Sequence, residues 1–220
     1  MKRTFFSLAL LLAVATLTAQ TKMTAREAAV KIADRILAST TYEFKNTKTG
    51  ETYKSVKKLP LDMDVKVACK YNNWHYTNGV TNMALMELGD KLGDKKYEKY
   101  VLKNMNFVFN EGNLDFFRKQ YDEAFKRDGW NAVRKLSWHM IFRGKRLDDN
   151  GPMGASLIEL QLKYPNDSFL GYINETAEHL NYGEPRLVDG TIARIWPHVN
   201  TIWADDAFMA ISFLARMGKL

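Results

Sequence analysis

Cysteine is nearly absent from this chain of 220 residues, in which Cys69 stands alone, so no intrachain disulfide can form. Histidine is also scarce. His75, His139, His179 and His198 fall at no spacing that is typical of a metal site. The sequence contains no phosphate-binding loop, dinucleotide glycine motif, His-Glu-x-x-His motif or nucleophile elbow. These absences exclude disulfide-stapled domains and many enzyme classes.

Long apolar runs are missing after the first residues. The basic pair Lys2 and Arg3 precedes an apolar run over residues 5–17, and the small-residue context TLTA ends at Ala19. This pattern predicts a secretory signal peptide over residues 1–19, cut after Ala19. An uncleaved anchor is the alternative, although the run is short for a stable membrane span. We therefore predict a periplasmic or secreted protein with no membrane span after cleavage.

The chain also lacks an excess of acidic residues. Removal of Lys2 and Arg3 from its 32 Lys and Arg leaves 30, against 25 Asp and Glu, a net charge of +5. A basic balance occurs in nucleic-acid-binding proteins. Here the lysines are scattered, no basic stripe carries aromatic residues, and an exported protein rarely meets nucleic acid. We predict no nucleic-acid partner and favour an acidic substrate such as a polyuronide.

Apolar residues recur at helical spacing along most of the remaining chain. The segment TAREAAVKIADRILAST predicts a first helix, in which Thr24 and Glu27 have the spacing of a capping box. Residues 40–64 are polar and predict a loop with a short hairpin at TKTGET, and residues 184–200 predict a loop with a strand pair at VDGT. Further helices are expected near residues 80–92, 94–110, 153–162, 167–182 and from 205 onward, with short helices joined by turns over residues 112–144.

Two of the predicted helix pairs resemble each other at an offset of 72 residues. ALMELGDKLGDKKYEKYV aligns with SLIELQLKYPNDSFLGYI, which pairs Leu85 with Leu157 and Tyr97 with Phe169. Chance likeness of two amphipathic hairpins is the alternative. Repeated αα-hairpins predict an all-α toroid, bundle or solenoid. The segment AISFLARMGKL is similar to the first half of a third copy.

Paired aspartates occur at two of the predicted helix starts. Asp148 and Asp149 lie in RLDDNGPMGASL, ahead of a Gly-Pro turn, and Asp205 and Asp206 lie in TIWADDAFMAIS. Such carboxylates can be plain helix N-caps. Bulky apolar neighbours favour a second interpretation, because carboxyl groups beside buried rings can have shifted pKa values that suit acid–base chemistry. Trp203 would add a stacking surface for a sugar ring.

A further helix start, NNWHYTNGV, carries Trp74, His75 and Tyr76. Tryptophan and tyrosine rings on loops suit platforms that bind carbohydrate. Core packing of Trp74 and helix capping by Thr77 or Asn78 are the alternatives.

The motifs WHYTNGV, RLDDNGPMGASLIEL and NTIWADDAFMAISFLARMGKL, in this order, resemble the unsaturated uronyl and rhamnogalacturonyl hydrolases of glycoside hydrolase families 88 and 105. The resemblance runs from about Trp74 to Leu220. It implies an (α/α)6 barrel of six helical hairpins, no metal or organic cofactor, and an unsaturated uronyl oligosaccharide as the partner. The implied reaction removes the unsaturated uronic acid that a polysaccharide lyase leaves at a non-reducing end. A carboxylic acid protonates C4 of the C4–C5 double bond, water adds at C5, and the hemiketal opens and expels the remaining sugar.

The same resemblance implies roles for individual residues. The aspartate of the family's Trp-x-Asp motif falls on Asp205, as general acid and then base. Asp149 would hold water or substrate, with Asp148 and Asp206 as alternates. Asp206 should turn about 100° away from the pocket, because a helix has about 3.6 residues per turn. The candidates for the sugar-pocket lining are Trp74, Tyr76, Met153, Arg194, His198 and Trp203. Among them, Arg194 suits a uronate carboxylate.

The chain is short for such a barrel. It supplies about six or seven helices by periodicity, where six hairpins need twelve. We therefore expect residues 20–220 to form a partial (α/α)6 domain, the N-terminal half, in which the last helix exposes apolar side chains and promotes self-association. The alternative functions are an inactive, truncated helical module that binds sugar and a helical scaffold that binds proteins.

Overall fold

The computed structural model describes residues 23–144 and 146–220, so the predicted signal peptide lies outside the described residues. Among the described residues, those up to Arg35 belong to one compact unit and Ile36–Leu220 form the other. Helix α2 (Ala25–Ser39) begins with the predicted capping box. The backbone N–H of Thr24 donates to the Glu27 carboxylate at 2.9 Å, and the backbone N–H of Glu27 donates to the Thr24 hydroxyl at 3.2 Å. Within the described ranges, no helix has both the length and the apolar character needed to cross a membrane.

The polar segment after α2 contains a small antiparallel sheet. Strand β1 (Phe44–Asn46) lies between β2 (Thr52–Tyr53) and β3 (Val65–Val67), with the short 3-10 helix η1 (Val56–Lys58) between β2 and β3. Phe44 pairs with Tyr53 in β2 and with Val67 in β3. The hairpin predicted at TKTGET is therefore confirmed, whereas β3 was not predicted.

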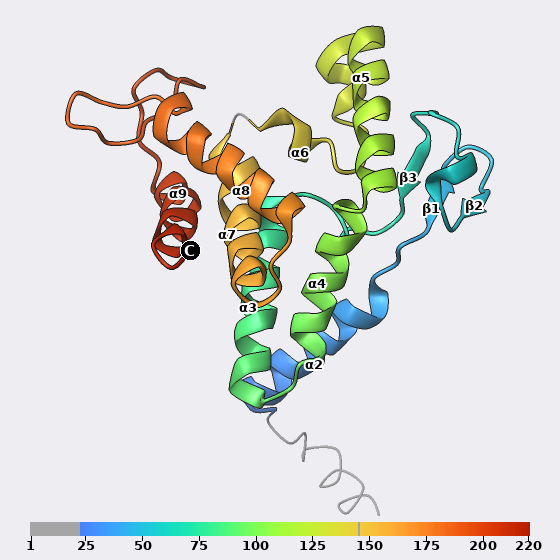
Figure 1. Ribbon diagram of the computed structural model, residues 1–220, viewed down its shortest axis with the longest axis horizontal. Helices are drawn as coiled ribbons and strands as arrows, with labels where there is room; N and C mark the ends of the chain where they lie inside the picture. The colour runs from blue at the N-terminus through green and yellow to red at the C-terminus, as the bar shows by residue number, and fades with distance from the viewer. Residues whose placement is uncertain (1–22, 145) are drawn as a thin grey trace, which may run out of the picture. The chain divides into compact units, whose positions relative to one another are not determined.

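Two helical hairpins carry the predicted repeat (Figure 1). Helices α3 (Tyr76–Leu92) and α4 (Lys96–Val108) form the first, and α7 (Leu147–Lys163) and α8 (Asp167–Glu178) form the second. Tyr97 and Phe169 occupy equivalent positions in the two hairpins and are both fully buried. Helix α9 (Ala204–Met217) follows. The all-α class built on repeated αα-hairpins is confirmed.

The first helices of these hairpins pack directly on each other. Helix α7 contacts α3 and also α9 (Figure 1). A Cβ atom on Gly79 would lie 2.4 Å from the carbonyl carbon of Pro152, and one on Gly151 would lie 2.1 Å from the carbonyl oxygen of Met209. Both distances are shorter than real Cβ atoms allow. Glycine at these two positions therefore lets the N-terminal turns of α3, α7 and α9 approach one another.

Between the hairpins, the structure agrees in part with the predicted series of short helices. Element α5 (Glu111–Val133) consists of two helices joined at a kink, where Asp128 and Gly129 have non-helical backbone angles. The four-residue helix α6 (Met140–Arg143) follows it. Aromatic side chains in this region stack on one another, as Tyr121 and Phe125 do at 6.3 Å between ring centroids. Only the first of these helices, before Asp128, is longer than predicted, and the helical pieces after Gly129 are short and joined by turns.

Helix α7 begins at Leu147, six residues before its predicted start at Met153. Gly151 and Pro152 were interpreted as a turn ahead of the helix, but they lie inside it. Pro152 is the sixth residue of the helix and lies beyond its first turn, so it removes the backbone hydrogen bond that its position would donate to the carbonyl of Asp148, and the helix continues past it. The consequence is that both members of the first aspartate pair lie within the first turn of α7.

The segment after α8 leads back to the start of α9. A π-helical turn, η2 (His179–Gly183), ends the α8 helix. An antiparallel bridge between Arg186 and Ile192 confirms the strand pair predicted at VDGT. A second bridge joins Arg194 to Thr201 and brings the loop to the N-terminus of α9.

Candidate active site

The first turns of α7 and α9 bring the two aspartate pairs together. Side-chain oxygens of Asp148, Asp205 and Asp206 all lie within 4.8 Å of one another. Asp148 is partly buried, the side chain of Asp206 is 9% exposed and that of Asp205 is 53% exposed. The positive ends of two helices face these carboxylates, which partly offsets their mutual repulsion. Two motifs that are separated in the sequence thus form one acidic cluster.

Arg194 forms an ion pair with one member of this cluster. Its Nη2 donates to Oδ1 of Asp206 at 2.6 Å, and its Nε donates to Oδ2 of the same carboxylate. Oδ2 of Asp205 is more distant, at 3.8 Å from Nη2. The guanidinium carbon lies 4.1 Å from the ring centroid of Trp203. The hydrogen bond to Asp206 raises the pKa of Arg194 above its ordinary value, so the guanidinium is charged.

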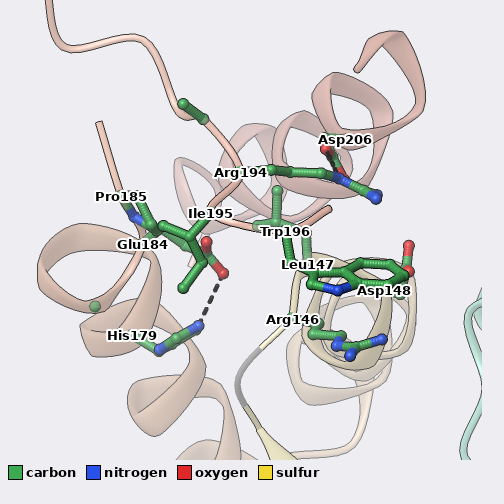
Figure 2. Close-up of a pocket in the computed structure, with 12 residues that line it drawn as sticks. Arg146, Leu147, Asp148, His179, Glu184, Pro185, Arg194, Ile195, Trp196 and Asp206 are labelled. Atoms are coloured by element: carbon green, nitrogen blue, oxygen red, sulfur yellow. Dashed lines mark hydrogen bonds and ion pairs between the residues drawn. The ribbon is translucent and has the colours of Figure 1, made fainter. Parts of the chain in front are cut away.

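A cavity of about 570 Å³ lies beside the acidic cluster. Figure 2 shows His179 and Glu184 on one side of it and Arg146 and Trp196 on the other. Its titratable lining residues are Arg146, Asp148, His179, Glu184, Arg194 and Asp206. The volume falls within the range of about 300–1,000 Å³ that is usual for small-molecule sites. The cavity can therefore admit a ligand of the size of one or two sugar rings.

Two carboxyl groups on the cavity wall hold their protons more tightly than ordinary carboxyl groups do. Burial raises the pKa of Asp148, with Arg194 opposing the shift and the neighbouring Asp206 adding to it. Burial also raises the pKa of Glu184, although Nε2 of His179 lies 2.9 Å from its Oε1 and favours the charged form. A carboxyl group that keeps its proton nearer to neutral pH is better suited to act as a general acid.

Asp149 faces away from the cavity. Its side chain is fully buried, and its carboxylate accepts hydrogen bonds from Arg143, one of them from Nε at 2.5 Å. Its carbonyl oxygen accepts a hydrogen bond at 2.6 Å from the indole N–H of Trp74, which is also fully buried. These contacts join the starts of α3 and α7 to α6. In this structure, the carboxylate predicted to hold water or substrate is therefore out of reach of a ligand.

Comparison with known protein families gives a match that includes the residues of the acidic cluster and the cavity. A sequence model of Glycosyl Hydrolase Family 88 matches residues 54–220, a range that contains both aspartate pairs and every residue of the cavity. The chain belongs to glycoside hydrolase family 88. No curated protein matches it. Membership makes these residues a glycoside hydrolase domain and implies activity of the unsaturated glucuronyl hydrolase type on an oligosaccharide.

The family also accounts for the helical hairpins. Family 88 has an (α/α)6 fold, to which the hairpins α3–α4 and α7–α8 belong. The predicted resemblance to family 88 is confirmed, whereas that to family 105 stays a prediction.

In this family 88 chain, the residues that were predicted to line the sugar pocket do not all lie at the cavity. Arg194 lines the cavity. Trp203, at the N-terminus of α9, contacts the guanidinium of Arg194 with its ring. Met153 is in the core with Trp74, because α7 is buried between α3 and α9. Tyr76 is half-buried at the start of α3, with its ring 4.5 Å from that of His75. His198 is exposed in the loop before α9.

Four polar or aromatic residues of the cavity lining were not predicted from the sequence. Arg146 immediately precedes the first aspartate pair, so its place in the motif RLDDNG could have revealed it. His179 and Glu184 flank the π-helical turn, and Trp196 lies in a loop without periodicity. Such turns are frequent at functional sites, but no sequence pattern identifies them. His179, Glu184 and Trp196 could therefore be found only from the fold.

Proposed function

We propose that the chain binds an unsaturated uronyl oligosaccharide at the acidic cluster and removes the terminal unsaturated uronic acid by hydrating its C4–C5 double bond. The observation that carries the proposal is the convergence of Asp148, Asp205 and Asp206 within 4.8 Å beside a cavity of about 570 Å³. Protonation of an enol ether carbon needs a carboxylic acid that is protonated when the substrate binds. A group of close carboxylates favours such an acid, because like charges at short distance oppose full ionisation.

We assign the proton transfer to the Asp148 and Asp205 pair. Asp206 is ion-paired with Arg194, so its carboxylate is engaged by the guanidinium. Burial raises the pKa of Asp148, so this carboxyl group holds its proton more tightly than an ordinary aspartic acid does. Asp205 has the accessible carboxyl group of the cluster, since its side chain is 53% exposed. Asp205 does not line the cavity itself but lies at its edge, beside the lining residues Asp148 and Asp206. We therefore assign Asp205 as the general acid and then base that meets the sugar at this edge, with Asp148 beside it.

The steps balance with one molecule of water. The proton moves to C4, and positive charge develops at C5 and the ring oxygen, where the anionic Asp206 stabilises it. Water adds to C5 and gives a proton back to Asp205. The product of this addition is a hemiketal at C5. The hemiketal opens by breaking the bond between C5 and the ring oxygen, which leaves a ketone at C5 and a hemiacetal at C1. The hemiacetal then expels the rest of the oligosaccharide as an alcohol.

A helical module that binds sugar without turnover is the second candidate. The exposed rings of Trp196 and Trp203, 67% and 41% accessible, favour it because they offer stacking surfaces beside the cavity. Binding of this kind needs the rings and the arginines but no proton donor.

The test uses the full 220-residue chain with unsaturated glucuronyl and galacturonyl disaccharides. Loss of the ultraviolet absorbance of the double bond measures turnover, and titration calorimetry measures binding. Turnover supports the proposed hydrolase. Binding without turnover supports the sugar-binding module, and the absence of both contradicts the two assignments together.

We also propose that the chain acts in the periplasm or outside the cell, on the basis of the predicted signal peptide. N-terminal sequencing of the protein from an exporting host should give Gln20 as the first residue. Retention of Met1 would contradict this placement.

A further inference from the structure

The cavity contains two arginines in different electrostatic situations. Arg194 directs both Nε and Nη2 to the carboxylate of Asp206 and lies over the ring of Trp203. Its charge is compensated by an acid that is itself nearly buried. A ligand carboxylate that approached Arg194 would have to compete with Asp206 in a geometry that already uses one edge of the guanidinium. Arg194 therefore maintains the cluster and is poorly placed to bind an anion.

Arg146 is the contrasting case. It lies at the N-cap position of α7, with an extended backbone, and its side chain caps no backbone N–H of that helix. Among residues 23–144 and 146–220, no carboxylate lies within ion-pairing distance of its guanidinium. The guanidinium carbon lies 5.7 Å from the ring centroid of Trp196. Figure 2 shows the two side chains on the same side of the cavity. Its charge is uncompensated, and the aromatic ring limits its positions.

Several other charged residues on the cavity wall are acids. An acidic ligand can therefore bind in this cavity only if a cation without an acidic partner is there to attract it. Asp148 and Glu184 line the same cavity as the ion pair of Arg194 and Asp206. A uronate carboxylate that entered without an unpaired cation would meet a wall of acids. The positive end of α7 adds to the attraction at Arg146, because the free N–H groups of its first turn lie beside this residue.

We infer that Arg146, held against Trp196, binds the carboxylate of the uronic acid and so selects acidic sugars at this site. The inference rests on the proposed function and identifies the residue that recognises its substrate class. The sequence alone had favoured Arg194 for this role. The carboxylate of an unsaturated uronic acid is attached to C5, next to C4. Because Arg146 and Asp148 line the same cavity and Asp148 belongs to the acidic cluster, a carboxylate at Arg146 brings the double bond toward that cluster.

The experiment compares an unsaturated uronyl disaccharide with its neutral methyl ester. Calorimetry gives Kd for each ligand, and the double-bond absorbance gives kcat and KM. The parent chain should bind the acid about 10- to 100-fold more tightly than the ester, as expected for a charge-assisted hydrogen-bonded pair. Arg146→Gln should bind acid and ester about equally, through a rise in Kd and KM for the acid, while kcat changes less. Arg146→Lys should keep part of the preference, because it keeps the charge and loses the planar fork.

Arg134→Gln is the matched control, since Arg134 is exposed at the end of α5 and outside the cavity lining. It should keep the full preference for the acid. The inference is overturned if folded Arg146→Gln keeps the parent's preference, or if the parent binds acid and ester equally. If the parent binds the acid selectively through Arg146 but turns nothing over, the proposed hydrolase fails and the inference stands. If the parent binds neither ligand, both are overturned.

Discussion

Arg194 and Asp206 form a two-bonded ion pair that ties the loop after α8 to the first turn of α9. The pair gives the two adjacent aspartates of this turn different environments. Asp206 is buried against a guanidinium, and Asp205, one residue earlier, keeps an accessible carboxyl group. The expectation that Asp206 turns away from the pocket is therefore wrong, because the loop that carries Arg194 covers it and builds the cavity on that side.

Asp206→Asn should destabilise the chain. The substitution leaves the guanidinium of Arg194 without its compensating charge, which costs up to about 3–5 kcal/mol in a fully buried pair. A smaller loss is expected here, since the Arg194 side chain is 20% exposed. Urea unfolding followed by circular dichroism measures the change. Asp167→Asn is the control, because Asp167 is an exposed acid in the first turn of α8. Equal unfolding free energies for the two variants would contradict a structural role of the pair.

Gly151→Ala should destabilise the packing of α7 on α9, because the new Cβ would lie 2.1 Å from the Met209 carbonyl oxygen. Backbone must move to admit it, with a cost typical of overpacking, about 1–3 kcal/mol or more. Gly171→Ala in α8 is the matched control, since nothing lies within 4 Å of a Cβ there. Helix propensity predicts that this second change stabilises the chain by up to about 1 kcal/mol. A neutral Gly151→Ala variant in thermal unfolding would contradict the close approach of the two helices.

Asp148→Asn should make the chain more stable at pH 7. Burial raises the pKa of Asp148 in the folded chain above 3.8, so the folded state binds its proton more tightly than the unfolded state. Stability is therefore lost as pH rises from about 3.8 through the folded pKa, and asparagine avoids this loss because it does not ionise. The gain over the parent should disappear at pH values below about 3.8, where both states are protonated.

Asp189→Asn provides a control of opposite sign for this pH dependence. The backbone N–H of Thr191 lowers the pKa of Asp189, so its carboxylate favours folding near neutral pH. The variant should show no gain at pH 7. Urea titrations over a pH series give the free energy of unfolding of the parent and of both variants. If Asp148→Asn is more stable than the parent by the same amount at every pH, the stabilisation does not come from the ionisation of Asp148.

Helix α9 should promote self-association. Phe208 and Ile211 are 48% and 60% exposed, and with Val80 of α3 they line a groove of about 770 Å³. Burial of one such side chain contributes about 1.5–3 kcal/mol. Sedimentation velocity over a concentration series should therefore show association, which Ile211→Glu weakens and Val188→Glu, in the exposed loop before α9, does not. A parent chain that stays monomeric at the highest concentration would contradict the prediction.

Local signals in the sequence were sufficient for the helical hairpins. Gly93 ends α3 where predicted, with a φ of 67° that glycine adopts without strain. The equivalence of Tyr97 and Phe169 followed from the apolar pattern, because both positions face the core of the same kind of hairpin. Each aspartate pair was predicted to lie at a helix start, and both do, in the first turns of α7 and α9.

The contacts that divide the site into core and cavity could not be predicted from the sequence. Trp74 is buried because Tyr172 packs against it at 4.8 Å between ring centroids, almost a hundred residues later. Asp149 is buried because Arg143 reaches it from α6. Long-range partners of this kind leave no mark on the residues beside them. A tryptophan and an aspartate at a helix start therefore look alike in the sequence whether they face a ligand or the core.

The measurement that most directly tests the central claim is the rate of loss of the double-bond absorbance of an unsaturated uronyl disaccharide. The parent chain, Asp205→Asn, Asp148→Asn and the control Asp167→Asn are compared, each checked for folding by circular dichroism. A positioned general acid contributes about 10²–10⁴ in rate, so Asp205→Asn should lose at least that factor. Asp148→Asn should be slower than the parent, with a pH profile displaced to lower pH, because the proton reserve beside Asp205 is gone. Asp167→Asn should match the parent. A folded Asp205→Asn chain that hydrates the disaccharide at the parental rate would contradict the account.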